Sequence, residues 1–150
     1  KSLLRHSKAV SSVNDLTKGG FQEIIDDNIE ANNVTQLVFC SGKFYYELVE
    51  QRETLQRNDI AFVRIEQLFP LHKEKIKNIL DKYKQVKRYM WAQEEPQNMG
   101  AWSYMLQHFT EVKLEVASQK INAATASGSS MRFKKRHQEV IDKVFSKQNK

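Results

Sequence analysis

Apolar and polar positions follow two alternating patterns along this chain. Short, nearly uninterrupted apolar runs have the length of buried strands, and they span residues 36–41, 59–65, 87–93 and 113–118. After each run, apolar residues recur every three or four positions, as in amphipathic helices, over residues 43–58, 73–83, 100–111 and 131–145. This order predicts an α/β fold in which an open, mostly parallel sheet forms the middle of three layers and is flanked by helices.

The predicted helices have defined inward faces. Pro70 suits the first turn of the second helix, because its fixed φ angle matches the helix and its missing N–H is not needed there. In the third helix, the spacing predicts that Trp102 and Leu106 are both buried. In the last helix, the same spacing predicts burial of Phe133 and Val140.

The chain divides into an arm and a domain. Residues 1–20 are polar and irregular, and we expect them to form an extended arm over a neighbouring domain. Residues 21–150 are long enough for one domain with its own core, and residues 21–25 are expected to form a short edge strand. The chain begins without Met and without an apolar leader, so we expect it to be a fragment of a longer multidomain chain.

Composition narrows the class of function. The net charge is +6, with much of the excess near the C-terminus, but RNA-binding, zinc-finger and helix-turn-helix motifs are missing. We therefore expect no nucleic-acid partner, and no apolar run is long enough for a membrane partner. The single cysteine, Cys40, lies in an apolar run and is predicted to be a buried, unreactive thiol.

The loops after the strands are the expected place for ligands, because parallel sheets bind at the carboxyl ends of their strands. Gly42, after the first strand, allows close backbone approach at a helix N-terminus, although a simple tight turn is the alternative. The adjacent carboxylates Glu94 and Glu95 could do acid–base chemistry if burial separated their pKa values, but we favour a structural role in a cap or an interface. Metal-ligand spacings, a nucleophile elbow and a dinucleotide fingerprint are all missing, so the chain lacks a complete catalytic set.

Four segments in this order resemble one enzyme family. They are KSLLRHSKAVSS at residues 1–12, VFCSGKFYYELVEQR at 38–52, IAFVRIEQLFPLH at 60–72 and WAQEEPQNMGAW at 91–102. Together they closely resemble the C-terminal end of the E1 component of 2-oxoglutarate dehydrogenase. The resemblance implies a transketolase C-terminal-like domain, which agrees with the fold predicted from the apolar pattern.

The resemblance also implies an activity for the full chain. The family uses thiamine diphosphate and Mg²⁺ to decarboxylate 2-oxoglutarate and passes the succinyl group to the lipoyl group of E2, in the tricarboxylic acid cycle. Its catalytic and cofactor-binding motifs lie in two preceding domains, so we expect no catalytic residue, no metal ligand and no cofactor in these 150 residues. The implied partners are a homodimer partner, the preceding E1 domains and the E2 succinyltransferase complex. The implied location is the bacterial cytoplasm, with the mitochondrial matrix as the alternative.

Some family members respond to nucleotide or acyl-CoA effectors near this domain. As effector or anion contacts we predict Arg5, His6, Ser41, Lys43 and Arg52, although a solvated basic arm is the alternative for the first two. As interface contacts we predict Glu66, Gln67, Glu94, Glu95, Gln97, Asn98 and Trp102. Two other interpretations remain: the same domain of another 2-oxoacid dehydrogenase, and a stand-alone anion- or nucleotide-binding module that would bind its ligand unaided.

Overall fold

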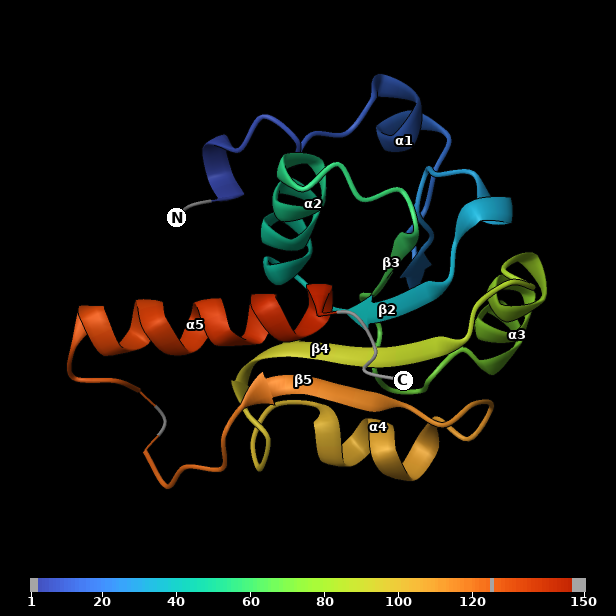
Figure 1. The fold of residues 1–150 in the computed structure, drawn as a ribbon. Helices are drawn as coiled ribbons and strands as arrows, with labels where there is room; N and C mark the ends of the chain where they lie inside the picture. Colours follow the sequence, from blue (N-terminus) through green and yellow to red (C-terminus); the bar gives the residue numbers. More distant parts are fainter. Residues whose placement is uncertain (1–2, 125, 147–150) are drawn as a thin grey trace.

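The computed structural model describes residues 3–124 and 126–146, so residues 1–2, 125 and 147–150 of the predicted arm and domain lie outside the described part. Five strands form one sheet in the order β1-β3-β2-β4-β5 (Figure 1). Their bounds are Ile24–Ile25 (β1), Gln36–Cys40 (β2), Ile60–Ile65 (β3), Arg88–Pro96 (β4) and Glu115–Gln119 (β5). β1 is an antiparallel edge strand and every other pair is parallel, which confirms the predicted mostly parallel sheet.

The central strand explains why the sequence shows uninterrupted apolar runs. In β2, Val38 is paired with Phe62 of β3 on one side and with Met90 of β4 on the other. All five β2 residues are buried, because helices cover both faces of the sheet. A strand covered on both faces has no solvent-facing positions, so polar residues do not alternate along it.

Two separate apolar cores lie on the two faces of the sheet. Phe39, Val63 and Trp91 point to the face covered by α3 (Lys73–Lys82) and α4 (Trp102–His108). Residues of opposite parity, such as Val38 and Phe62, point to the face covered by α2 (Phe44–Thr54) and α5 (Ser130–Phe145). The predicted three-layer architecture is therefore confirmed (Figure 1).

Three local predictions are corrected. Helix α3 begins at Lys73, and the ring Nδ1 of His72 caps it by accepting a hydrogen bond from the Lys75 N–H at 3.4 Å, so Pro70 lies before the helix. Leu106 is 62% exposed, because α4 is only seven residues long and buries the adjacent stripe instead. Phe133 is 45% exposed, because it lies in the N-terminal half of α5, which extends beyond the sheet (Figure 1).

β4 extends further than the apolar run predicts and includes Glu94 and Glu95. After an irregularity in the ladder, Pro96 pairs with Gln119 of β5. The Gln119 side-chain amide donates to the Glu94 carbonyl at 2.8 Å, and the Gln97 N–H donates to the Gln119 carbonyl at 3.0 Å. These bonds fix the end of β4, so the two carboxylates project from a strand rather than from a loop.

The N-terminal segment is more ordered than predicted. It contains a 3₁₀ turn at Leu3–Arg5 and a short helix, α1 (Val13–Thr17). Ser12 and Asp15 form a capping box at the start of α1, with the Ser12 N–H donating to the Asp15 carboxylate at 2.8 Å. The sequence SVND at residues 12–15 carries this signal.

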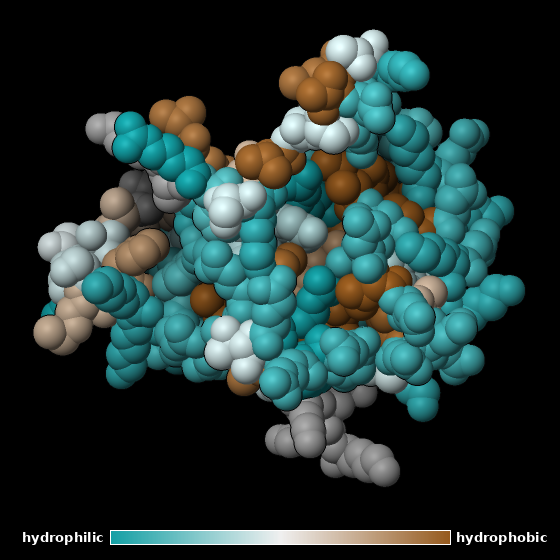
Figure 2. All heavy atoms as spheres, turned by 90° about the horizontal axis from the view of Figure 1, so that it is seen from above, coloured by the Kyte–Doolittle hydropathy of each residue, from teal (hydrophilic) through white to brown (hydrophobic). Residues whose placement is uncertain are grey.

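Most of this segment is exposed, including several large apolar side chains. Leu4, Val10, Val13, Leu16 and Phe21 are each at least 70% exposed. Figure 2 views the molecule from the side on which the segment lies and shows apolar groups, in brown, standing out from a hydrophilic surface. None of the described helices is both long enough and apolar enough to span a membrane.

Candidate functional site

The ends of β2 and β4 bring two predicted site residues together. Gly42 makes the turn after β2 with a φ angle of +57°, and Lys43 follows it at the start of α2. The Lys43 ammonium lies 3.2 Å from a carboxylate oxygen of Glu94 and also pairs with Glu47. Glu47 in turn pairs with the ring Nε2 of His137, which α5 contributes. Four polar residues from three elements thus form one connected cluster, which we call the Lys43 cluster.

Electrostatics hold two members of the Lys43 cluster, Lys43 and Glu47, in their charged forms. The hydrogen bond from His137, helped by Lys43, lowers the pKa of Glu47 to about 2 despite partial burial. Burial disfavours the charged amine of Lys43, but its hydrogen bonds to Glu47 and Glu94 outweigh burial and raise its pKa above the ordinary value. Neither shift brings a group toward neutral pH, so the arrangement is suited to binding elements together rather than to proton transfer.

The same cluster includes the one group of potential metal ligands among the described residues. Ligand atoms of Glu47, Glu94 and His137 all lie within 4.8 Å of one another. The Lys43 ammonium already bonds both carboxylates and supplies the positive charge between them. Mg²⁺ prefers near-octahedral oxygen ligands. An imidazole and two lysine-paired carboxylates therefore do not fit the Mg²⁺ of a thiamine diphosphate site.

The backbone N–H of Gly42, just before α2, also bonds a carboxylate of the domain itself. The Gly42 N–H donates to a Glu66 carboxylate oxygen at 3.3 Å. That carboxylate lies 3.7 Å from the Nε of Arg64, whose guanidinium donates to the Tyr46 hydroxyl at 2.8 Å. Ser41 is partly buried beside this turn. The position where an external anion would bind is therefore occupied by the carboxylate of Glu66.

Gln93 organises the loop between β4 and α4 and was not predicted as a site residue. Its side-chain oxygen accepts from the Trp91 indole N–H at 2.8 Å and from the Trp102 backbone N–H at 3.0 Å. Its amide nitrogen donates to the carbonyls of Pro96 and Met99 at 3.1 and 2.8 Å. A glutamine inside an otherwise apolar strand was the available signal, since buried polar side chains require partners.

Gly100 makes this arrangement possible. Its φ angle is +63°, and a Cβ atom there would lie 3.0 Å from a Glu95 carboxylate oxygen and 3.1 Å from the amide nitrogen of Gln93. The loop therefore needs glycine both for its backbone conformation and for the space that Gln93 fills.

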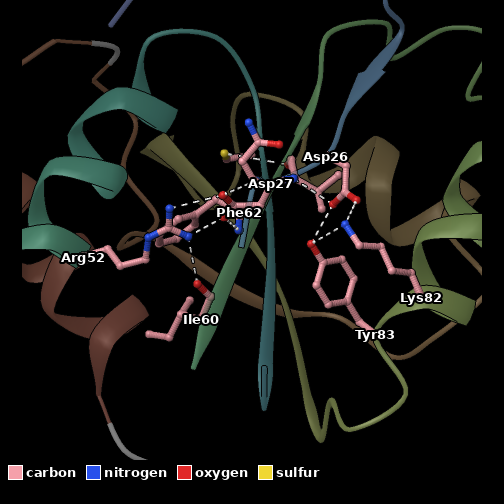
Figure 3. Close-up of polar contacts among 10 residues, drawn as sticks. Asp26, Asp27, Arg52, Ile60, Phe62, Lys82 and Tyr83 are labelled. Atoms are coloured by element: carbon pink, nitrogen blue, oxygen red, sulfur yellow. Dashed lines mark hydrogen bonds and ion pairs between the residues drawn. The ribbon is translucent and has the colours of Figure 1, made fainter. Parts of the chain in front are cut away.

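Arg52 has a structural role at the other end of α2 (Figure 3). Its guanidinium pairs with both carboxylate oxygens of Asp27, one at 3.2 Å, and donates to the Ile60 carbonyl at 3.1 Å. Asp27 also accepts from the Phe62 N–H at 2.7 Å. The Arg52 and Asp27 side chains are only 11% and 3% exposed. The structure therefore does not bring Arg52 together with Ser41 and Lys43 as the sequence analysis expected.

The residue next to this pair ties the same loop to α3. Asp26 accepts a hydrogen bond from the Tyr83 hydroxyl at 2.9 Å and pairs with Lys82 at 2.5 Å (Figure 3). Burial, reinforced by this hydrogen bond, raises the pKa of Tyr83 well above its ordinary value. The loop after β1 is thus anchored to helices on both faces of the sheet.

The remaining effector candidates lie on the N-terminal segment. His6 contacts Glu50 of α2 at 3.0 Å, and its ring centroid lies 5.1 Å from that of Tyr46. Lys8 pairs with Glu53 one turn further along α2. Arg5 is exposed. These contacts fix the segment along α2 but place neither predicted residue in the Lys43 cluster.

The interface candidates divide by exposure. Glu95 and Gln97 are exposed. The side-chain amide of Gln67 donates a hydrogen bond to the Pro70 carbonyl at 2.9 Å. Asn98 is exposed and exchanges two hydrogen bonds with Asn122, at 3.0 and 3.1 Å. Trp102 is only 8% exposed and packs in the core beneath α4, so its ring does not form part of a surface.

Cys40 is fully buried, as predicted, and burial raises the pKa of its thiol.

Comparison with known proteins gives consistent sequence matches. Residues 10–145 match a family model described as 2-oxoglutarate dehydrogenase C-terminal. The 2-oxoglutarate dehydrogenase E1 components of Haemophilus influenzae and Azotobacter vinelandii are 41% and 37% identical over 97% of this chain. In both cases this chain spans only 16% of the relative's length.

Solved structures resemble the fold at much lower identity. A split-gene transketolase, described as an inactive β4 tetramer, gives a TM-score of 0.55 over 76% of this chain and 39% of its own. A 2-oxoglutarate:ferredoxin oxidoreductase from Magnetococcus marinus gives 0.53 over 85% of this chain and 21% of its own. Both are 13% identical, so they bear on architecture alone.

Proposed function

Because this chain belongs to the 2-oxoglutarate dehydrogenase C-terminal family, we propose that it is the C-terminal structural and regulatory domain of a thiamine diphosphate-dependent E1 component. The observation that carries the proposal is the match itself, which covers nearly the whole chain but a small part of each relative. The chain thus corresponds to one module of a longer enzyme.

In this proposal the full chain decarboxylates 2-oxoglutarate and transfers the succinyl group to the E2 lipoyl group, within the tricarboxylic acid cycle. Thiamine diphosphate and Mg²⁺ are held by the parts of E1 that precede this domain. The Lys43 cluster supports this division, because its carboxylates are neutralised by an ammonium group and are a poor Mg²⁺ site. The isolated domain is then inactive. We assign the enzyme to the bacterial cytoplasm, with the mitochondrial matrix as the alternative.

We place the contact with the preceding E1 domains or the homodimer partner on two exposed surfaces. One is the edge that carries the exposed side chains of Glu66, Glu95, Gln97 and Asn98 and the partly buried Gln67. The other is the N-terminal segment with its five exposed apolar side chains, since apolar groups exposed together commonly mark contact surfaces. Glu94 and Trp102 are assigned to the internal structure of the domain.

For effector control we retain Ser41 and Lys43 as the proposed anion contacts, with Arg5 and His6 on the adjoining segment. An incoming phosphate at the Gly42 turn must displace Glu66 and compete with the carboxylates that Lys43 already binds. In the full-length enzyme, Lys43→Met should therefore weaken any response to added AMP or acetyl-CoA, whereas Lys77→Met, on the exposed face of α3, should not. An unchanged response in Lys43→Met would exclude this site.

The proposed function is tested with the full-length polypeptide and a version lacking these 150 residues. CO₂ release from 2-oxoglutarate is measured with thiamine diphosphate and Mg²⁺ present, and the dimer is measured by sedimentation. We expect the full-length protein to be an active dimer and the truncated one to lose both properties. Activity that survives the truncation undiminished would show that the domain is not a required part of the enzyme.

A further inference from the structure

Five cations that form no ion pair within the described part of the chain lie together on one surface of this domain. Elsewhere, most arginines and many lysines pair with carboxylates, as Arg52, Arg57 and Arg88 do. Other described lysines without an ion pair, such as Lys18, Lys77 and Lys84, lie elsewhere, but five such cations between the end of β5 and helix α5 lie close to one another. They are Lys120, Arg132, Lys135, Arg136 and Lys143.

These five cations line a single cleft of about 650 Å³, which we call the basic groove. Ser118, Gln119 and Asn122 provide its polar floor on the β5 side. The one acidic side chain in its lining is Glu139. The groove therefore concentrates positive charge, although the chain as a whole is only moderately basic.

Helix geometry makes the basic groove long. Arg132, Lys135, Arg136 and Lys143 share one side of α5 at spacings of three, four and seven or eight residues. From Arg132 to Lys143 the helix rises about 16 Å. The N-terminal half of α5 extends past the sheet (Figure 1), and residues 130–136 are all exposed there. The C-terminal half is held in the core by Val140, Ile141, Val144 and Phe145.

We propose that the basic groove binds an extended acidic segment of a partner protein. Several spaced cations on a rigid helix suit a chain that presents several carboxylates in a row, and such complementary charges steer association and fix register. Ile121 lines the same groove and is 73% exposed, which offers an apolar contact within the basic surface.

Other anions fit the groove less well. No aromatic side chain lines it, so it lacks the stacking surface that single-stranded nucleic acid uses. Its five cations are all exposed, whereas a small phosphate ligand is usually enclosed by buried polar groups. The groove includes none of the residues assigned above to contacts within E1, so its failure would leave the proposed function standing.

The test measures binding of a short, fluorescein-labelled peptide rich in glutamate with one central leucine. The protein is used at its native length, and anisotropy is recorded at low salt and at about 0.15 M salt. The variant Arg132→Gln/Lys135→Gln/Arg136→Gln removes three charges from the groove. The control Lys18→Gln/Lys77→Gln/Lys84→Gln removes three exposed charges elsewhere, so both variants have the same net charge.

We expect the groove variant to bind at least about tenfold more weakly and the control to change less than about twofold. Glu139→Gln, which removes the groove's acidic residue, should bind more tightly than the wild type. Equal weakening by both triple variants would overturn the proposal, because it would show a general effect of net charge. Absence of wild-type binding, or tighter groove-dependent binding of tripolyphosphate or a single-stranded RNA, would overturn it as well.

Discussion

Removing the Asp27 carboxylate should strongly lower the free energy of unfolding of this domain, because it breaks the buried ion pair with Arg52. In Asp27→Ala, the guanidinium of Arg52 loses its partner while its side chain remains 89% buried, and the Phe62 N–H loses its acceptor. Breaking a buried ion pair from one side costs about 3–5 kcal/mol, because a charge is left in the interior without compensation. Out of a typical total of about 5–15 kcal/mol, this is a large fraction of the free energy of unfolding.

The double variant Asp27→Ala/Arg52→Met tests whether the cost of Asp27→Ala comes from the unpaired charge of Arg52. It removes both charges, so the remaining costs are the unpaired Phe62 N–H, about 1–3 kcal/mol, the hydrogen bond that the Ile60 carbonyl loses with Arg52, and any loss of packing. The double variant should therefore be more stable than Asp27→Ala alone. Glu53→Ala is the matched control, because it breaks an exposed pair with Lys8 and should cost less than about 1 kcal/mol.

These free energies can be measured by urea unfolding of the 150-residue chain, followed through tryptophan fluorescence. The two tryptophans, Trp91 and Trp102, are both buried, so each reports loss of the core. A cost for Asp27→Ala no larger than that of Glu53→Ala would refute the argument. So would a double variant that is less stable than the single one.

Two further predictions concern the strand ends. Gly100→Ala should lower the free energy of unfolding by about 1–3 kcal/mol, because the positive φ angle at this position disfavours a Cβ atom, and that atom would also press on Gln93. As the control, Gly128→Ala should change the free energy of unfolding by less than about 0.5 kcal/mol in the same urea assay, because the space around Gly128 is open. The pKa of Glu47 falls from 4.5, its ordinary value in an unfolded chain, to about 2 in the folded state, so its stabilisation is complete above pH 4.5 and is lost as the pH falls toward 2. Glu47→Gln should thus lower the free energy of unfolding by about 1 kcal/mol at pH 7, after allowance for solvent screening, and the two proteins should become equally stable near pH 2 when both are unfolded at a series of pH values. A difference in the free energy of unfolding that stays constant with pH would contradict this.

Prediction from sequence succeeded where the pattern is set by local geometry and burial. Val38, Phe62 and Met90 lie in runs that are mostly apolar and do not alternate with polar positions, and such runs are typical of strands covered on both faces. It failed at Leu106 and Phe133, where helical spacing marks an apolar residue but cannot show where the neighbouring sheet ends. It also missed the start of α3, because histidine is not a common N-cap.

The site was predicted less completely, because its contacts join residues far apart in the chain. Lys43 and Glu94 were both named because the apolar pattern placed each after a strand of a parallel sheet, but their pairing depends on the neighbouring positions of β2 and β4. His137 completes the cluster from α5, and no local pattern links it to Glu47. Arg52 was chosen for its charge, and only the fold shows that Asp27 already uses that charge.

The central claim is that this chain is one domain of a longer E1 enzyme, and the mass of the native polypeptide tests it most directly. An antibody raised against the 150-residue chain is used to detect the protein in extracts of its source cells by denaturing electrophoresis. The account predicts a band several times larger than the 17.6 kDa of this chain, because the chain covers 16% of its relatives' length. A sole product of 17.6 kDa would contradict the account and leave a stand-alone binding module as the better explanation.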